Sequence, residues 1–145
     1  MQNFYQLMAL IEDEKDAIAN MANISAWLND ELDRINWVGF YLMKNGELVL
    51  GPFQGHPACT HITLGRGVCG TCAVTKTTQR VKDVHQFPGH IACDAQSRSE
   101  IVIPLICNDE VIGVLDIDSP VIDRFTEEDQ THLEHIARAI IPYIM

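Results

Sequence analysis

Four of the five cysteines of this 145-residue chain lie within one stretch, CTHITLGRGVCGTCAVTKTTQRVKDVHQFPGHIACD. They are Cys59, Cys69, Cys72 and Cys93, and the fifth, Cys107, follows shortly after. Clustered thiols can serve as core packing, a structural disulfide, a zinc site or a redox centre. The neighbouring residues allow these roles to be ranked.

Core packing suits two of the cysteines. Free cysteine is often buried as a small hydrophobic residue. Cys107 ends an apolar run and Cys72 stands beside an Ala-Val pair, so both fit this interpretation. Cys59, Cys69 and Cys93 fit it poorly, because their neighbours are Gly, Pro, His, Asp and Thr in segments predicted as loops.

A zinc site or a thioredoxin-type motif is a weaker interpretation. Cys69-x-x-Cys72 has ligand-like spacing, but structural zinc sites usually pair two such units. The candidate partners His85 and His90 are too loosely spaced to form the second one. A thioredoxin-type Cys-x-x-Cys follows a buried strand in a βαβ unit, whereas this one follows TLGRG between predicted hairpins. We therefore expect no bound metal and no bound cofactor.

A reactive thiol with a resolving partner is the remaining interpretation. A nucleophilic cysteine needs a lowered pKa, from a helix N-terminus or a nearby cation, and access to its substrate. Cys93 lies in the His-rich segment PGHIACD, and Cys69 lies beside Gly70, where a short helix is expected to begin. These residue types leave the choice between Cys93 and Cys69 open.

Hydrophobic periodicity predicts the elements that position these residues. NFYQLMALI and AIANMANISAWLNDELDRI have helical spacing, and FTEEDQTHLEHIARAIIPYI opens with a near capping box at Thr126 and Asp129. WVGFYLM and ELVLGPF flank Asn-Gly, and EIVIPLI and VIGVLDID flank CNDE, which predicts two hairpins. VKDVHQFPGHIACDAQSRS is predicted as a long loop. The fold class is α+β, with an antiparallel β-sheet flanked by N- and C-terminal helices in a single domain spanning residues 1–145.

Composition limits the partners. Ten basic residues face twenty acidic ones, so a net charge of −10 disfavours nucleic acids and anionic membranes. The N-terminus has no basic segment followed by an apolar one, as a secretory signal would have. We therefore expect a cytoplasmic protein, in which clustered cysteines are more often catalytic, redox-active or metal-binding than structural.

Six segments together resemble one known family, the free methionine-(R)-sulfoxide reductases, whose fold is of the GAF type. They are INWVGFYL, LVLGPFQG, GRGVCGT, FPGHIACD, SEIVIPL and IGVLDIDS. The likeness is dense from Ile35 to Thr126, and the spacing of Cys59, Cys69 and Cys93 is specific to this family, because GAF domains in general lack that set.

The resemblance implies a reaction and a role for each thiol. Free L-methionine-(R)-sulfoxide would be reduced to methionine, with Cys93 as nucleophile, Cys59 as the resolving cysteine that forms a disulfide, and Cys69 as an auxiliary or recycling thiol. Thioredoxin would be the external reductant, with NADPH as the source of its electrons. Cys72 and Cys107 lie outside the pattern, and Cys72 offers an alternative disulfide partner.

The resemblance also implies a substrate pocket. Trp37 and Tyr41 would line it, and Glu100, Asp116 and Asp118 would supply its carboxylates. Strand alternation puts Trp37 and Tyr41 on one face, and likewise Asp116 and Asp118. Acidic and aromatic groups suit the ammonium and methyl groups of the substrate, and a carboxylic acid of raised pKa can protonate the departing oxygen. We expect Asp118 on the oxygen side, with Glu100 and Asp116 holding the ammonium group.

Two other expectations accompany this interpretation. Gly39, between Trp37 and Tyr41, is expected to leave a gap that suits a small ligand. GAF domains often dimerise through an exposed N-terminal helix, so the resemblance allows a homodimer.

The alternative function is a non-catalytic GAF-type module that senses a small ligand or the redox state. Such a module would be oxidised once and would not turn over.

Overall fold

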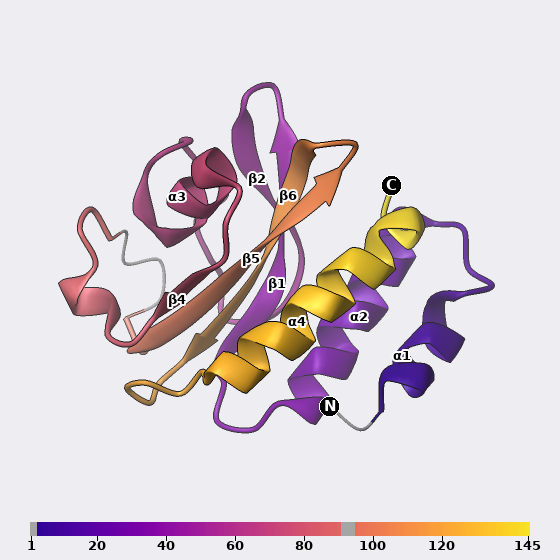
Figure 1. The fold of residues 1–145 in the computed structure, drawn as a ribbon, viewed down its shortest axis with the longest axis horizontal. Coiled ribbons are helices and arrows are strands. Elements are labelled where there is room, and N and C mark those ends of the chain that lie inside the picture. Colours follow the sequence, from indigo (N-terminus) through magenta and orange to yellow (C-terminus); the bar gives the residue numbers. More distant parts are fainter. Residues whose placement is uncertain (1–2, 91–94) are drawn as a thin grey trace.

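The computed structural model describes residues 3–90 and 95–145, which form one antiparallel sheet with helices on both faces (Figure 1). The sheet has the strand order β3-β2-β1-β6-β5-β4. Its strands are β1 (Trp37–Lys44), β2 (Glu47–Gly55), β3 (His61–Ile62), β4 (Gln79–Val81), β5 (Ser99–Cys107) and β6 (Glu110–Ser119). The predicted α+β class and antiparallel sheet are therefore confirmed.

The described ranges contain four α-helices: α1 (Phe4–Ile11), α2 (Ala17–Glu31), α3 (Gly67–Thr75) and α4 (Glu127–Ile140). Helices α2, α3 and α4 pack on the sheet, and α1 packs on α2. Two short 3₁₀ helices, η1 (Val84–Gln86) and η2 (Ile141–Tyr143), complete the set. In Figure 1, α2 and α4 lie side by side on one face of the sheet, and α3 lies on the other. No helix among the described residues is long and apolar enough to span a membrane.

Both predicted hairpins form, and their turns explain why. Asn45 and Gly46 have φ angles of 52° and 82°, and Asn108 and Asp109 have 51° and 65°. Two consecutive residues with positive φ are the signature of the type I′ turn, which matches the twist of the two flanking strands. The turns fix the register, with Lys44 opposite Glu47 in the first hairpin and Cys107 opposite Glu110 in the second.

Strand alternation divides the core into two clusters. Val38, Phe40, Ile101 and Ile117 point toward α1, α2 and α4, where most of the buried apolar residues gather. Trp37, Tyr41, Val102 and Val114 point the other way, toward α3. The face under α3 therefore receives every strand residue that the sequence predicted for the pocket.

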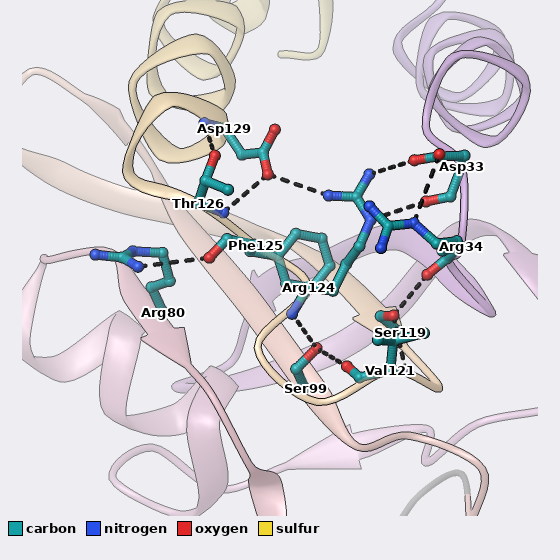
Figure 2. A network of polar contacts seen from close by, with 10 residues as sticks. All are labelled: Asp33, Arg34, Arg80, Ser99, Ser119, Val121, Arg124, Phe125, Thr126 and Asp129. Carbon is teal, nitrogen blue, oxygen red and sulfur yellow. Dashed lines mark hydrogen bonds and ion pairs between the residues drawn. The ribbon is translucent and has the colours of Figure 1, made fainter.

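A buried arginine holds the strand ends that carry those residues (Figure 2). The guanidinium of Arg124 donates to the carboxylates of Asp33 (2.9 Å) and Asp129 (3.1 Å). The backbone N–H of Arg124 donates to Ser99 at the start of β5, and Ser119 at the end of β6 donates to the carbonyl of Arg34. This network ties β5, β6, the turn before β1 and the start of α4 together, next to the positions of Glu100 and Asp118 on the two strands.

The capping box at the start of α4 forms as predicted, with Thr126 and Asp129 exchanging side-chain and backbone hydrogen bonds. Three predictions on the chain between the hairpins are wrong. The short strands β3 and β4 were not expected, because two or three residues give no readable alternation. Helix α3 begins at Gly67 rather than near Gly70, and η1 lies within the segment predicted as loop.

Candidate functional site

A small cavity of about 40 Å³ lies between α3 and the sheet. Its walls come from β1, β3, β5, β6, α3 and the loops that precede α3 and β5. The lining residues are Trp37, Tyr41, Ala58, Ile62, Arg66, Gly67, Val68, Cys69, His90, Ser97, Glu100, Asp116 and Asp118. The cavity thus brings together every substrate-binding residue predicted from the sequence, and Cys69.

Two stacked aromatic side chains form one wall. The rings of Trp37 and Tyr41 are 5.9 Å apart and nearly parallel, at 24°. Each ring is fixed at its polar end, because Trp37 Nε1 donates to the carbonyl of His56 (3.1 Å) and the Tyr41 hydroxyl donates to the carbonyl of Cys59 (2.9 Å). Both hydrogen bonds tie the aromatic wall to the segment that carries Cys59.

The expected gap above Gly39 is occupied, so that prediction is wrong. The ring of Phe53 on β2 stacks on Trp37 at 5.1 Å, and a Cβ atom built on Gly39 would lie 2.3 Å from the Cβ of Phe53. Glycine is required here because Phe53, on the paired strand, approaches the backbone of β1. The sequence did not reveal this cross-strand neighbour.

Strand pairing brings the three carboxyl groups together. Glu100 on β5 lies opposite Asp118 on β6, and Asp118 also lies opposite Trp37 on β1. Asp116, two residues before Asp118, points to the same face of the sheet. The carboxyl cluster, defined as Glu100, Asp116 and Asp118, therefore lies beneath the aromatic wall.

The carboxyl cluster is buried and incompletely satisfied. Glu100 is 7% exposed and Asp116 is 5% exposed. Asp116 Oδ1 and Asp118 Oδ1 are buried and make no hydrogen bond, and no Lys or Arg of the described residues pairs with these carboxylates. Buried carboxylates without cations are costly, which is typical of a site that awaits a positively charged ligand.

Burial and mutual repulsion shift the pKa values of this cluster. Burial raises the pKa of Glu100 well above its usual value, and the charges of Asp116 and Asp118 raise it further. Burial also raises the pKa of Asp116 and, well above its usual range, that of Asp118, although Ser97 lowers the latter through a hydrogen bond. The raised pKa values favour a proton held within the carboxyl cluster beside a remaining negative charge.

The two cysteines of α3 lie in different surroundings. Cys69 faces the cavity and is only 5% exposed, contrary to the prediction that it lies in a loop. Burial and the nearby carboxylates, Asp116 foremost, raise the pKa of the Cys69 thiol well above its usual value, which keeps it protonated. Cys72 is fully buried, as predicted, donates to the carbonyl of Val102, and has a pKa raised to about 12 by burial.

The remaining cysteines complete the set. Cys59 is disulfide-bonded, whereas Cys69, Cys72 and Cys107 are free thiols. Cys107 is half-buried at the end of β5 rather than part of the core. Cys93, the predicted nucleophile, lies outside the described residues.

Several cavity residues were not predicted as site residues, notably Arg66, His90 and Ser97. Burial and the neighbouring His85 lower the pKa of His90. A signal for two of these residues existed, since Arg66 is part of GRGVCGT and Ser97 precedes SEIVIPL by two residues. Polar residues in loops have no periodicity that would mark them as pocket residues.

The fold and the sequence both match known proteins. The GAF domain family matches residues 17–141. Free methionine-R-sulfoxide reductase of Escherichia coli (strain K12) is 55% identical over 128 residues, which cover 88% of this chain and 78% of that protein.

Two solved structures share the fold closely. The reduced form of fRMsr of Staphylococcus aureus is 59% identical, with a TM-score of 0.93 over 97% of this chain and 92% of that one. The free methionine-R-sulfoxide reductase of Neisseria meningitidis in complex with its substrate is 44% identical, with a TM-score of 0.94 over 97% of this chain and 84% of that one. This chain therefore belongs to the GAF domain family and, within it, to the free methionine-R-sulfoxide reductases, a family of oxidoreductases.

Proposed function

We propose that this protein reduces free L-methionine-(R)-sulfoxide to methionine with thiols as the electron source. The observation that carries the proposal is the carboxyl cluster, which is buried, lacks a cation and lies beneath the rings of Trp37 and Tyr41. The identity to reductases named for this substrate supports the same conclusion.

The substrate's polar groups fit this pocket. A free amino acid carries an ammonium group, and a buried carboxylate gains most from a cation that it can pair with directly. Glu100 and Asp116 are the deepest members of the carboxyl cluster and hold the ammonium group in our proposal. The stacked rings of Trp37 and Tyr41 provide an apolar surface for the methyl group on sulfur.

The chemistry divides into three balanced steps. The thiolate of Cys93 attacks the sulfoxide sulfur and a proton from Asp118 reaches the sulfoxide oxygen. The oxygen then passes to Cys93 as a sulfenic acid, and the sulfur is reduced to the thioether of methionine. The thiol of Cys59 then condenses with the sulfenic acid, which forms a disulfide and releases water. A dithiol reductant exchanges with this disulfide, restores both thiols and becomes a disulfide itself.

The described cysteines support this assignment of roles. Cys59 is disulfide-bonded while Cys69, Cys72 and Cys107 are free, which fits Cys59 as resolving cysteine and disfavours a Cys69–Cys72 bridge. The raised pKa of Cys69 disfavours it as nucleophile, because the thiolate is the reactive form. Cys69 remains the auxiliary thiol of the proposal.

Asp118 is the proposed proton donor to the sulfoxide oxygen. It lies between Glu100 and Trp37 in the register, so it stands between the ammonium side of the pocket and the aromatic wall. Burial raises its pKa well above its usual value, which favours the protonated form that a general acid needs.

The external partners are part of the same proposal. Thioredoxin is the proposed reductant and NADPH its electron source. A reaction that consumes thiols suits the reducing cytoplasm, where we place the protein. A homodimer is also proposed, and exposed apolar side chains on the N-terminal helices, such as Tyr5 and Ile18, support it.

The test is an NADPH-coupled thioredoxin assay with each diastereomer of free methionine sulfoxide. We expect NADPH oxidation and stoichiometric methionine with the R form alone. A sensor would consume at most one equivalent of reductant per chain, so a burst without turnover would contradict the proposal.

A further inference from the structure

We propose that Cys69, Glu100 and Asp116 bind one thiophilic divalent cation such as Zn²⁺, in the part of the pocket that receives the substrate's ammonium group. Cation and substrate would then exclude each other, so that the cation is a reversible inhibitor rather than a resident cofactor. The cation site stands on its own geometry, and only the mutual exclusion rests on the proposed function.

The geometry of the three ligand atoms carries the inference. Cys69 Sγ and one carboxylate oxygen each from Glu100 and Asp116 lie within 4.8 Å of one another. Tetrahedral Zn²⁺, with bonds of about 2.3 Å to sulfur and about 2.1 Å to oxygen, sets its ligand atoms roughly 3.3–3.7 Å apart. Small side-chain movements therefore complete a three-ligand site with one position open to water.

An independent observation points to a positive ligand at the same place. Asp116 is 5% exposed, and its Oδ1 atom is buried, lines the cavity and makes no hydrogen bond. No Lys or Arg in the described ranges pairs with Glu100 or Asp116. The carboxylates of Asp116 and Glu100 lie close to the Cys69 thiol and have no Lys or Arg paired with them in the described ranges.

Space and ligand chemistry narrow the class of cation. The cavity of about 40 Å³ has room for two or three groups of the size of a water molecule, enough for an ion and one remaining water. Ca²⁺ requires six to eight oxygen ligands and Mg²⁺ an octahedral oxygen shell, which three ligands including a thiolate do not supply. A thiolate with two carboxylates suits Zn²⁺ and its substitutes Co²⁺ and Cd²⁺.

This site differs from the zinc site considered from the Cys69-x-x-Cys72 spacing. Cys72 Sγ donates to the backbone carbonyl of Val102, and Cys72 does not line the cavity. Cys69 and Cys72 are three residues apart on α3, but their thiols lie in different surroundings. Of these two cysteines, Cys69 alone lines the pocket.

Titration of the full-length protein with Co²⁺ tests the inference without any catalytic readout. The protein is used with Cys59 in its disulfide, so the described free thiols are Cys69, Cys72 and Cys107. We expect one Co²⁺ per chain, visible absorption of a tetrahedral ion and an ultraviolet thiolate-to-cobalt band. Zn²⁺ should displace Co²⁺, whereas Mg²⁺ should not.

Variants assign the ligands. Cys69→Ser should abolish the thiolate band, and Asp116→Asn should weaken Co²⁺ binding by more than the roughly 10–100-fold that loss of an outer-sphere partner costs. Cys107→Ser, at a half-buried thiol far along β5, is the matched control and should bind Co²⁺ normally. Circular dichroism confirms folding, and Glu100→Gln replaces any variant that does not fold.

The outcomes separate the two parts of the claim. No thiolate band, or a band that persists in Cys69→Ser, would overturn the cation site. Free methionine should displace Co²⁺ competitively if the two ligands share the pocket. Cobalt binding that methionine leaves unchanged would overturn the mutual exclusion, while turnover in the diastereomer assay would show independently whether the proposed function holds.

Discussion

At the residue scale, the site depends on groups that are costly in a protein core. Three carboxyl groups and a thiol share one buried cavity, and two carboxylate oxygens have no hydrogen-bond partner. Buried polar groups are normally satisfied, and exceptions concentrate at functional sites. The arrangement is explained if the ligand provides the missing cation and donates the missing hydrogen bonds to Asp116 and Asp118.

Cys93→Ser should abolish reduction of free methionine-(R)-sulfoxide, because serine is a poor nucleophile toward sulfur. Methionine formed in a single turnover without external reductant is the measurement, and Cys107→Ser is the control that should behave as wild type.

Peptide mapping of the oxidised wild type should find a Cys59–Cys93 disulfide. A dominant Cys69–Cys72 bridge, or single-turnover methionine from Cys93→Ser, would reassign the thiols.

The carboxyl cluster should separate binding from proton transfer. Asp118→Asn should lower kcat by roughly 10²–10⁴-fold with a smaller effect on KM, since it removes the proposed proton donor. Asp116→Asn should mainly raise KM, since it removes an ion pair with the ammonium group. Steady-state kinetics of both variants are the test. Normal turnover with weaker binding in Asp118→Asn would show that the roles are wrongly assigned.

At the element scale, the close packing of β1 on β2 shapes the aromatic wall. Gly39→Ala would put a Cβ atom 2.3 Å from Phe53 Cβ and 2.9 Å from the carbonyl oxygen of Pro52, so the strands must separate. We expect a loss of about 1–3 kcal/mol in unfolding free energy, measured by denaturant titration, and a raised KM because Trp37 moves with β1. Gly51→Ala is the control, since its nearest atom would be at 3.3 Å. Equal losses in both variants would contradict this account.

The elements that the sequence predicted well are those with strong local signals. The two hairpins carry Asn-Gly and Asn-Asp turns, and α4 carries a capping box, so local chemistry determines each of them. The shared face of Asp116 and Asp118 followed from strand alternation alone. The placement of Phe53 over Gly39, the burial of Cys69 and the approach of His90 depend on contacts between distant segments, which no local pattern encodes.

At the scale of the whole molecule, the site should reduce stability at neutral pH. Burial raises the pKa of Glu100, so the folded protein binds this proton more tightly than the unfolded chain does. The resulting stabilisation is complete below the unfolded pKa of about 4.3 and is lost as pH rises through the folded pKa. Functional sites commonly carry such a cost.

Glu100→Gln should therefore become more stable relative to wild type as pH rises from about 4 to 8, by at most about 1.4 kcal/mol per pH unit. Unfolding free energies from denaturant titrations at several pH values are the measurement. Glu12→Gln, at an exposed position before α2, is the control and should follow the wild-type curve. Parallel curves for Glu100→Gln and wild type would show that Glu100 is not a buried acid.

The central claim is that the pocket recognises the free amino acid through its ammonium group. Comparison of free and N-acetylated L-methionine-(R)-sulfoxide in the NADPH-coupled thioredoxin assay tests it most directly, because acetylation removes the charge and leaves the sulfoxide unchanged. Leaving a buried carboxylate without its cation costs on the order of 3–5 kcal/mol. We therefore predict that kcat/KM falls by roughly 10²–10⁴-fold on acetylation. Comparable values for the two compounds would contradict the account.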